Sequence, residues 1–318
     1  MHSEMKQIFA LCDVNAMYAA CETVFDPSLV GRPVVVASNN DGCAVARNAE
    51  AKALGIRMGQ PIFELREHVE KNGLVVCSSN YALYGDMSFR FIQTLATFSP
   101  GVMPYSIDEA FLDLTGIESV VSYEDFGHQI RDVVKQWTGL PICVGVAPSP
   151  TLAKLANHGA KKYPATRGVV DLTDRDRQRR LLKLVPAGEI WGIGSKLSKR
   201  LADLGIQTGL QLADADPKWI RKHFSVVVER TVRELNGVPC HEDLLEVAPA
   251  KKQILCSKSF GTPVTDLDSM LSAVSHHATR AAEKLRKENR ECGYLATFMS
   301  TSRYRSGKHY ANQKGIAL

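Results

Sequence analysis

The sequence predicts an α+β protein made of three successive parts, and three features of its pattern support this. Short apolar runs typical of buried strands alternate with helix-like segments as far as about residue 172. From Asp174 the chain becomes short-helical, and a second, smaller pattern of strand, helix and strand begins at Gln253. With 318 residues, of which 45% are hydrophobic, the chain is long enough for two or three domains.

The first part is predicted to contain a mixed sheet with helices between its strands. Each predicted strand is an apolar run bounded by polar or turn residues, and the Ala-rich run before Gly55 is typical of a helix that ends at a glycine. The predicted strands are residues 8–14, 33–37, 73–77 and 142–147, with a hairpin over 103–114 and a turn at 39–42. The predicted helices are residues 16–24, 44–54, 81–98, 123–137 and 151–160.

The later parts are separated by a polar, acid-bearing stretch at residues 239–249, which we interpret as a linker. The final module is predicted to have strands at 254–260 and 294–300 around a helix at 267–289. Two strands and one helix leave unpaired strand edges, so we expect this module to need another chain for stability. Residues 304–309 are polar and basic, and we expect them to be disordered.

Composition narrows the class of protein. The eight cysteines are scattered singly without zinc-ligand spacing, and no window is apolar enough for a signal peptide or membrane span. We therefore expect reduced thiols and a cytoplasmic protein. Residues 251–318 carry 12 Lys and Arg against 5 Asp and Glu, a net charge of +7, which leaves −2 for residues 1–250. A basic module of this kind predicts a polyanionic partner such as nucleic acid, with a merely solvated basic face as the alternative.

Three acidic residues are candidates for chemistry. Asp13 ends one predicted strand, and Asp108 and Glu109 lie on the predicted hairpin, so neighbouring strands can gather them at one edge of the sheet. Clustered carboxylates need cations, and their hard oxygen atoms suit Mg²⁺, two ions of which can assist phosphoryl transfer. Taken singly, Asp13 could instead cap the following helix, and the other two could be turn residues.

The sequence around these acids resembles that of a known family. Residues 11–22 (LCDVNAMYAACE) and 105–110 (YSIDEA) resemble the two acidic motifs of the Y-family, the error-prone DNA polymerases that copy past lesions. Residues 38–43 (SNNDGC) and 46–52 (ARNAEAK) are typical of the branch that supplies the catalytic subunit of bacterial polymerase V, including plasmid-borne relatives. The resemblance extends from about residue 8 to about residue 302.

The resemblance implies a right-handed polymerase fold and a function in translesion synthesis, SOS mutagenesis and tolerance of DNA damage. It implies a palm with a mixed sheet, small fingers, a thumb with a helix-hairpin-helix and a partial little finger, because relatives continue beyond Leu318. The implied boundaries are 1–16 and 83–172 for the palm, 17–82 for the fingers, 173–240 for the thumb, 241–252 for the linker and 253–318 for the little finger.

The resemblance also implies roles for single residues at the site of nucleotidyl transfer. Asp13 and Asp108 would be metal ligands, Glu109 would complete the catalytic carboxylates, and the backbone carbonyl of Val14 would help to hold the second ion. The cofactor would be two Mg²⁺ ions, with Mn²⁺ as a substitute. Tyr18 would be the steric gate, a ring that excludes the 2′-hydroxyl of a ribonucleotide, whereas ordinary helix packing is the alternative for Tyr18.

Three cations are implied in nucleotide binding. Lys52 and Lys161 match lysines that contact the incoming triphosphate. Ala49 and Ala46 stand where relatives often have Tyr and Thr, and the guanidinium of Arg47 is a candidate replacement. A surface arginine at the start of a helix is the alternative interpretation of Arg47.

Sequence-independent DNA contacts are implied in the two later parts. Glycines at two positions would let the backbone approach a phosphate, and basic residues follow them. The implied DNA-binding residues are Gly192, Gly194, Lys196, Lys199 and Arg200 in the thumb and Arg280, Lys284 and Lys287 in the little finger.

The implied partners are primer-template DNA, a dNTP, a UmuD′-like subunit and a RecA filament, in a cytoplasmic protein that joins the nucleoid when active. Contact with the sliding clamp is doubtful, because the clamp-binding peptide of relatives lies beyond Leu318. Two other hypotheses remain open: a truncated, catalytically impaired DNA-binding or decoy subunit, and a nucleotidyl cyclase. The cyclase hypothesis gives no role to Tyr18 or to the glycines at 192 and 194.

Overall fold

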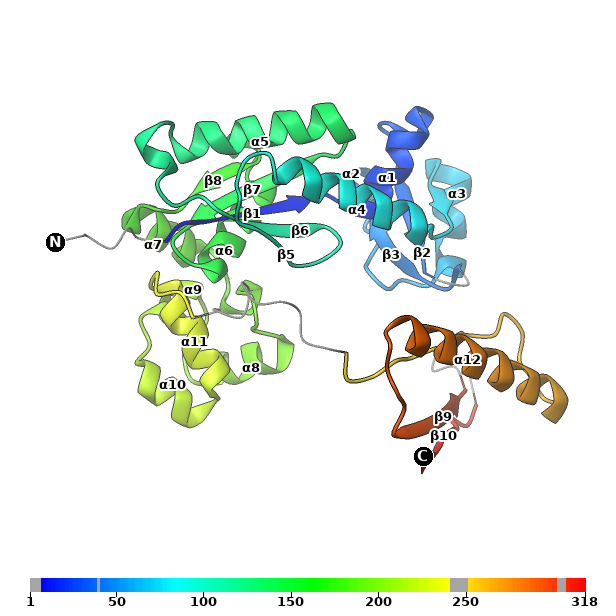
Figure 1. Cartoon of the computed structure of the whole chain (residues 1–318). Helices are drawn as coiled ribbons and strands as arrows, with labels where there is room; N and C mark the ends of the chain where they lie inside the picture. Colours follow the sequence, from blue (N-terminus) through cyan, green and yellow to red (C-terminus); the bar gives the residue numbers. More distant parts are fainter. Residues whose placement is uncertain (1–6, 39–40, 241–250, 302–306) are drawn as a thin grey trace. The chain divides into compact units, whose positions relative to one another are not determined.

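The structure, a computed structural model, describes residues 7–38, 41–240, 251–301 and 307–318. Its chain forms two compact units, residues 1–246 and 247–318 (Figure 1). The first unit contains two sheets and most of the helices, and the second contains one long helix and a two-stranded sheet. The α+β class predicted from the sequence is confirmed.

The larger sheet of the first unit has five strands in the order β5-β6-β1-β7-β8. The central strand β1 runs antiparallel to both β6 and β7, and β8 is parallel to β7. The register places Asp13 of β1 directly opposite Glu109 of β6. The strands are β1 (Phe9–Val14), β5 (Val102–Pro104), β6 (Glu109–Asp113), β7 (Ile142–Ala147) and β8 (Val169–Asp171).

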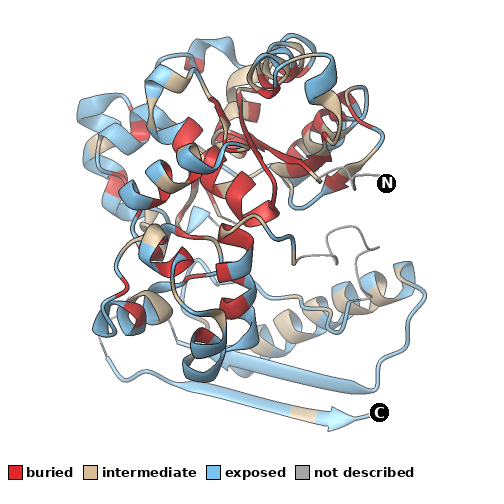
Figure 2. Ribbon diagram, turned by 90° about the vertical axis from the view of Figure 1, so that its left-hand side faces the viewer, coloured by how far each residue is buried: buried red, intermediate tan, exposed pale blue. Residues whose placement is uncertain are grey.

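Alternating side chains of β1 supply two separate cores, one on each face of the sheet. Ala10, Cys12 and Val14 belong to the core beneath α4 (Tyr81–Leu95) and α5 (Tyr123–Thr138). Phe9 and Leu11 belong to the core shared with α6 (Pro150–Lys162) and with the helices that follow it. Figure 2 shows the strands buried between these layers. Because the period of a strand is two, the odd-numbered Asp13 shares the face covered by α6.

Helix α6 lies unusually close to the sheet at Gly145 of β7. A Cβ atom at Gly145 would lie 2.3 Å from the backbone nitrogen of Asn157 and 2.4 Å from the carbonyl oxygen of Ala153, so only glycine fits. The Asn157 amide nitrogen donates to the carbonyl oxygens of Leu11 (3.3 Å) and Cys143 (2.9 Å), which ties the helix to two strands. Steric fit and hydrogen bonds together fix which residues of α6 face the strand ends.

The smaller sheet has the order β3-β2-β4, with β2 antiparallel to β3 and parallel to β4. The single helix predicted for residues 44–54 is wrong, because residues 44–47 form β3 and the helix that follows is short. Ala44 and Ala46 are buried against β2, and Asn48 then caps the helix by accepting from the Ala51 amide at 3.0 Å. The elements are α1 (Met17–Phe25), β2 (Val34–Ala37), β3 (Ala44–Arg47), α2 (Ala49–Ala53), α3 (Arg66–Asn72) and β4 (Val75–Cys77).

Five helices follow the larger sheet and pack on the side of α6. Their last helix is joined to the start of α6 by Glu234, whose buried carboxylate accepts from the Thr151 amide at 2.8 Å and whose carbonyl accepts from the Ser149 hydroxyl at 2.6 Å. The helices are α7 (Arg175–Leu184), α8 (Ser195–Asp203), α9 (Gly209–Ala213), α10 (Pro217–His223) and α11 (Val226–Leu235). Short 3-10 turns are η1 (Pro27–Leu29), η3 (Ile62–Leu65), η4 (Ile117–Ser119), η5 (Pro164–Thr166) and η6 (Ala187–Glu189).

The second unit contains α12 (Leu267–Lys287) and a hairpin of β9 (Tyr294–Ser300) and β10 (Ala311–Ala317). The predicted helix and the strand at 294–300 are present, but the strand predicted at 254–260 is wrong, because that segment joins no sheet. Most of the predicted linker at 239–249 and the first half of the predicted disordered stretch at 304–309 lie outside the described residues. Among the helices that the structure describes, none is long and apolar enough to span a bilayer.

Candidate active site

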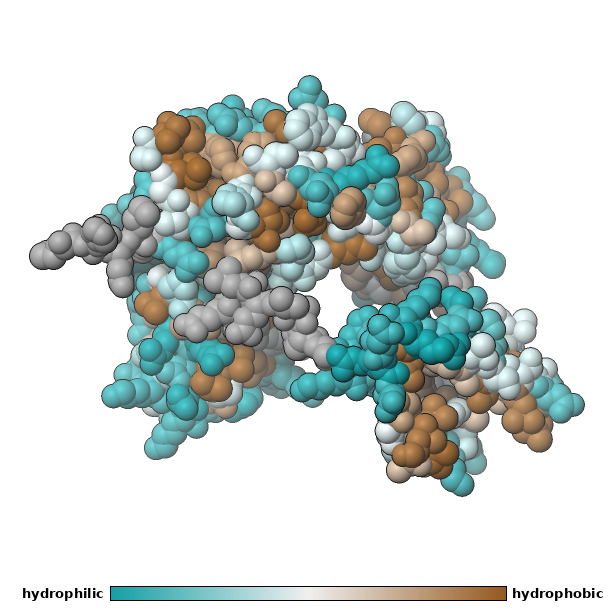
Figure 3. All heavy atoms as spheres, viewed as in Figure 1, coloured by the Kyte–Doolittle hydropathy of each residue, from teal (hydrophilic) through white to brown (hydrophobic). Residues whose placement is uncertain are grey.

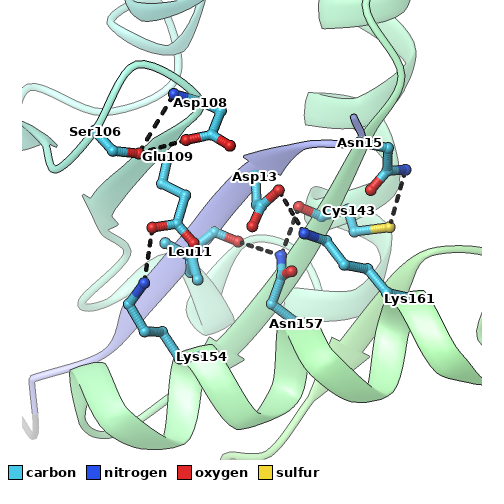
Figure 4. A network of polar contacts seen from close by, with 10 residues as sticks. All are labelled: Leu11, Asp13, Asn15, Ser106, Asp108, Glu109, Cys143, Lys154, Asn157 and Lys161. Atoms are coloured by element: carbon cyan, nitrogen blue, oxygen red, sulfur yellow. Dashed lines mark hydrogen bonds and ion pairs between the residues drawn. The ribbon is translucent and has the colours of Figure 1, made fainter. Parts of the chain in front are cut away.

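Two carboxylates meet at one edge of the larger sheet. Asp13 is next to last in β1 and Glu109 begins β6, and the antiparallel register makes them direct neighbours. The side chain of Asp13 is buried, with 7% of the residue exposed. Figure 4 shows both carboxylates turned toward α6. The sequence-based expectation that strand pairing would gather acids at this edge agrees with the structure for these two residues.

Helix α6 presents one lysine to each of these carboxylates. The Lys154 ammonium lies 2.7 Å from Oε2 of Glu109, and the Lys161 ammonium lies 2.5 Å from Oδ1 of Asp13 (Figure 4). Seven residues make about two helical turns, so the two lysines share one face of α6. The sequence pointed to Lys161 but not to Lys154.

Asp108 lies close in the backbone but its carboxylate is held away from the other two. Its carbonyl oxygen accepts from the Val14 amide at 2.8 Å, which joins the hairpin to the end of β1. Its carboxylate accepts from the Ser106 hydroxyl at 2.6 Å. Within the described ranges, no three His, Cys, Asp or Glu side chains converge as a ready-made metal site. The structure therefore pairs Asp13 with Glu109 and leaves the Asp108 side chain at the rim.

The electrostatics of Asp13 show that the site needs positive charge. The pKa of Asp13 is raised to about 7: burial is the largest cause, the ammonium of Lys161 opposes it, and the neighbouring Glu109 adds to it. Two adjacent carboxylates with hard oxygen donors fit a divalent cation, which would relieve the same repulsion that the lysines relieve here. The donor set at this edge is consequently suited to divalent metal ions.

Two more predicted cations belong to the part of the chain around the smaller sheet, Arg47 on β3 and Lys52 on α2. Burial lowers the pKa of Lys52, and the charges of Arg47 and Lys161 lower it further, whereas Asp13 opposes them. These couplings place Lys52 within electrostatic range of Lys161 on α6 and of Asp13. Arg47 lies on β3 rather than at a helix start, and its Nη1 donates to the Ile56 carbonyl oxygen at 2.6 Å. Of the three predicted triphosphate-binding cations, Lys161 therefore contacts Asp13 and Lys52 is electrostatically coupled to it, whereas Arg47 is coupled to Lys52.

Tyr18 belongs to a group of three tyrosines. Its ring stacks on that of Tyr84 with centroids 4.3 Å apart and meets the edge of Tyr81 at 5.8 Å. The buried Tyr84 hydroxyl donates to Glu22 at 2.6 Å, which fixes the ring beneath Tyr18. Burial raises the pKa of Tyr18, and the neighbouring Tyr81 and the charge of Asp108 add to this effect, so Tyr18 lies within electrostatic range of Asp108. Sequence reasoning identified Tyr18 but missed the two rings that support it.

A cavity of about 260 Å³ opens between the sheet edge, α6 and the segment that precedes α8. Both carboxylates and both α6 lysines line it, together with the imidazole of His158 and the indole of Trp191. The complete lining is Leu11, Asp13, Glu109, Thr151, Lys154, Leu155, Asn157, His158, Lys161, Glu189, Ile190 and Trp191. The paired acids therefore face an open space that can admit a small molecule or a chain end.

The predicted DNA-binding glycines lie just before α8. Gly192 has a φ of +85°, which favours glycine, and Gly194 precedes the first residue of the helix. Both glycines are exposed, as are Lys196 and Lys199. Arg200 is partly engaged within the protein, because its Nη2 donates to the His223 carbonyl oxygen at 2.8 Å and its guanidinium lies 4.8 Å from the Phe224 ring centroid.

The predicted basic residues of the second unit lie exposed on α12. Arg280 forms an ion pair with Glu283, and the Lys284 ammonium donates to the Leu255 carbonyl oxygen at 3.3 Å. Lys287 is exposed near the end of the helix. In Figure 3 the hydrophilic surface of this unit adjoins a brown, hydrophobic one.

Comparison with known proteins gives the family. Residues 12–158 match the model of the impB/mucB/samB family, and residues 251–317 match the model of its C-terminal domain. Protein UmuC of Salmonella typhimurium is 54% identical over 98% of this chain and 74% of its own length. Protein ImpB of Salmonella typhimurium is 55% identical over 93% of this chain and 70% of its length. DNA polymerase IV of Bacillus cereus is 32% identical over 90% of this chain and 68% of its length.

Solved structures resemble the fold as a whole. A Y-family DNA polymerase chimera of Dbh and Dpo4 superimposes with a TM-score of 0.75 at 22% identity, covering 98% of this chain and 88% of the chimera. An insertion ternary complex of Dbh DNA polymerase gives 0.62 at 21% identity, over 98% and 88% of the two chains. The fold and its acid-bearing sheet are those of the Y-family DNA polymerases. The chain belongs to the impB/mucB/samB family and is a UmuC-like member of it.

Proposed function

We propose that the protein is a DNA-directed DNA polymerase that copies past damaged bases with low fidelity, in SOS mutagenesis and damage tolerance. The observation that carries the proposal is the pairing of Asp13 with Glu109 at an open cavity, beneath two lysines of α6. Two acids in a UmuC-like chain, placed where a primer end and a triphosphate can enter, fit nucleotidyl transfer from a dNTP to a primer 3′-hydroxyl.

The chain's own residues hold the reactants. Asp13 and Glu109, with Asp108 turning inward from Ser106, would hold two divalent ions, Mg²⁺ by preference and Mn²⁺ as a substitute, aided by the Val14 carbonyl. When bound, such ions activate the attacking hydroxyl and stabilise the charge of the leaving pyrophosphate. Lys161, released from Asp13, neutralises triphosphate oxygens.

The parts of the chain then take the roles of a right-handed polymerase. The palm contains the larger sheet, residues 17–82 form the fingers with Lys52 and Arg47, and residues 173–240 form the thumb. Tyr18 lies under the sugar of the incoming nucleotide. The backbone at the glycines of α8, with Lys196, Lys199 and Arg200, receives a DNA phosphate, and Arg280, Lys284 and Lys287 of the little finger add further phosphate contacts.

The same proposal includes the partners. DNA and a dNTP are the substrates, and a UmuD′-like subunit and a RecA filament are the protein partners. The support for these two protein partners is the 54% identity to Protein UmuC over nearly the whole chain.

Primer extension across an abasic site tests the function. Purified protein with Mg²⁺, dNTPs and, in parallel, a UmuD′-like subunit and RecA filament should extend the primer past the lesion. Asp108→Ala should lower the rate by roughly 10²-fold or more, because it removes a metal ligand. Asp132→Ala, which changes an exposed acid on α5, is the matched control and should extend normally.

Two results would change the assignment. Equal extension by the protein and its Asp108→Ala variant would remove Asp108 from the metal site. Salt-sensitive DNA binding without extension in any of these mixtures would identify a non-enzymatic DNA-binding or decoy subunit instead.

A further inference from the structure

We infer that Lys154 is a positioning residue for Glu109: a box of three aromatic rings holds its ammonium against one carboxylate oxygen, so that Lys154 sets how strongly Glu109 attracts a metal ion. The inference rests on the proposed function of the carboxylate site. It assigns Lys154 a role different from that of Lys161, although both lysines lie on one face of α6.

The box is built from three separate parts of the first unit. The Lys154 ammonium lies 4.5 Å from the ring centroid of Tyr105, 5.1 Å from that of Trp191 and 6.0 Å from that of Phe111. Tyr105 precedes the acid-bearing turn, Phe111 lies within β6, and Trp191 lies just before the glycines of α8. The rings also contact one another, because Tyr105 meets Phe111 at 5.8 Å and Trp191 at 5.7 Å, both edge-on.

This environment favours a fixed cation. The Lys154 side chain is only 14% exposed, and ring faces attract a desolvated ammonium more strongly than a hydrated one. Its hydrogen bond to Oε2 of Glu109, at 2.7 Å, leaves the other oxygen available on the side of Asp13. Lys154 consequently restricts both the orientation and the free charge of Glu109.

Lys161 has none of this support. Its side chain is 40% exposed, and among the described residues no aromatic ring face meets its ammonium. Lys161 can therefore leave Asp13 for another anion at little cost, whereas Lys154 would have to leave both an ion pair and three rings. The difference identifies Lys154 as a permanent counter-charge and Lys161 as an exchangeable one.

A permanent counter-charge at Glu109 weakens metal binding but supports catalysis. Because Lys154 competes with a divalent ion for Glu109, removing its charge should tighten metal binding. The same change lets the Glu109 carboxylate rotate, so the rate of the chemical step should fall. A salt bridge with a merely structural role would not tighten metal binding when it is broken.

The test uses the full-length protein and two independent measurements. The first variant is Lys154→Met, which keeps the length and apolar stem of the side chain. Its dissociation constant for Mn²⁺, obtained from the EPR signal of the free ion, should be lower by at least about tenfold, as coupling between close charges predicts. In primer extension, kcat should fall while KM for the dNTP stays the same. In Lys161→Met, KM for the dNTP should rise instead.

Two further variants keep the test decisive. Lys154→Arg keeps the charge and should retain the wild-type affinity for Mn²⁺. Trp191→Leu opens the box without removing the charge and should tighten Mn²⁺ binding by about twofold to fivefold, the value of one cation–π contact. If Lys154→Met does not fold, Mn²⁺ binding by Trp191→Leu tests the role of Lys154 instead.

The outcomes separate this inference from the proposed function. If Lys154→Met folds, Mn²⁺ binding that is unchanged or weaker in this variant would overturn the role of Lys154. If Lys154→Met does not fold, the same result in Trp191→Leu would overturn it. The wild-type protein could instead fail to extend primers while the variants show the expected shift in Mn²⁺ affinity. That result would overturn the polymerase assignment but leave the effect of Lys154 on Glu109 in place.

Discussion

Tyr18 shows how a residue with a proposed function depends on neighbours that sequence motifs do not reveal. Its ring lies flat on Tyr84, with an interplanar angle of 14°, and Tyr84 is fully buried and bonded to Glu22. Packing and sugar discrimination are therefore compatible, because one face of the Tyr18 ring rests on Tyr84. The stacked partner restricts the ring to one orientation.

We predict that Tyr18→Ala admits ribonucleotides. Removing the ring opens space for the 2′-hydroxyl, so the preference for dNTP over rNTP in kcat/KM should fall by roughly 10²-fold. Single-nucleotide incorporation with matched dNTP and rNTP measures the ratio. The control is Tyr84→Phe, which keeps the stack and should keep the preference while lowering the free energy of unfolding by about 1 kcal/mol. An unchanged ratio in Tyr18→Ala would mean that Tyr18 only packs.

The sequence predicted Asp13, Glu109 and Lys161 because each belongs to a recognisable motif. Lys154 had no such signal, since a lysine on an amphipathic helix is most simply interpreted as solvated. Its partners Tyr105, Phe111 and Trp191 come together only through the tertiary fold. The site could therefore be predicted for its acids and not for the aromatic groups around them.

At the scale of elements, apolar runs were sufficient to predict β1 and β7, but the order of the strands depended on contacts far apart in the sequence. The hairpin of β5 and β6 was predictable because its two strands are close together in the sequence. The helix predicted for residues 44–54 was wrong in its first part. Alanine has a high intrinsic preference for helices, but residues 44–47 form a strand because β2 lies beside them and pairs with them. Strand β10 was missed because Ile316 is its only large apolar residue, so the strand contains no apolar run.

We predict that Gly145→Ala destabilises the protein. The added Cβ would meet the backbone of α6 at 2.3 Å, so the helix must move away from β7. The free energy of unfolding in urea should fall by about 1–3 kcal/mol. Gly85→Ala in α4, where a Cβ meets nothing within 4 Å, should instead increase it by about 0.4–1 kcal/mol. Equal effects of the two substitutions would contradict the close approach of α6.

The contact between α7 and α9 should give a pH-dependent stability. Two hydrogen bonds join Arg179 to Asp214, at 2.8 and 3.0 Å, and these bonds lower the pKa of Asp214 below its usual 3.8. Because the folded-state pKa is the lower one, this stabilisation is present above the unfolded pKa and is lost as pH falls through the folded pKa.

We predict that Asp214→Asn lowers the melting temperature slightly at pH 7, since the pair is half-exposed and screened by solvent. The difference from the wild type should be smaller at a second pH well below 3.8, where the carboxylate becomes protonated. Thermal unfolding at the two pH values measures it, with Asp132→Asn as the exposed control. A constant difference across this range would show that the ion pair contributes nothing.

For the whole molecule, charge and chemistry lie in different units. The carboxylate site belongs to the first unit, whereas residues 251–318 carry a net charge of +7. Sequence composition predicted this division of charge, whereas most of the segment predicted to join the two parts lies outside the described residues. The strand predicted at 254–260 failed because an apolar segment forms a strand only where a neighbouring strand pairs with it.

We predict that the basic face of α12 controls the salt dependence of DNA binding. Replacing Arg280, Lys284 and Lys287 with Gln should reduce the slope of log K against log salt by up to about 2.7, or about 0.9 for each phosphate that is no longer neutralised. Fluorescence anisotropy with labelled primer-template at several salt concentrations measures the slope. Lys71→Gln, an exposed lysine of α3, should leave it unchanged. An equal slope in the triple variant would remove α12 from the DNA interface.

The close approach of α6 to Gly145 has a consequence for how the protein should respond to ionic strength. Van der Waals contact and the two hydrogen bonds of Asn157 locate this helix, and neither is screened by dissolved ions as long-range charge attraction is. High salt should therefore detach DNA while leaving α6, and the helix face that carries Lys154 and Lys161, in place against the sheet. Activity that disappears in concentrated salt should return on simple dilution, or when the DNA concentration is increased enough to restore occupancy.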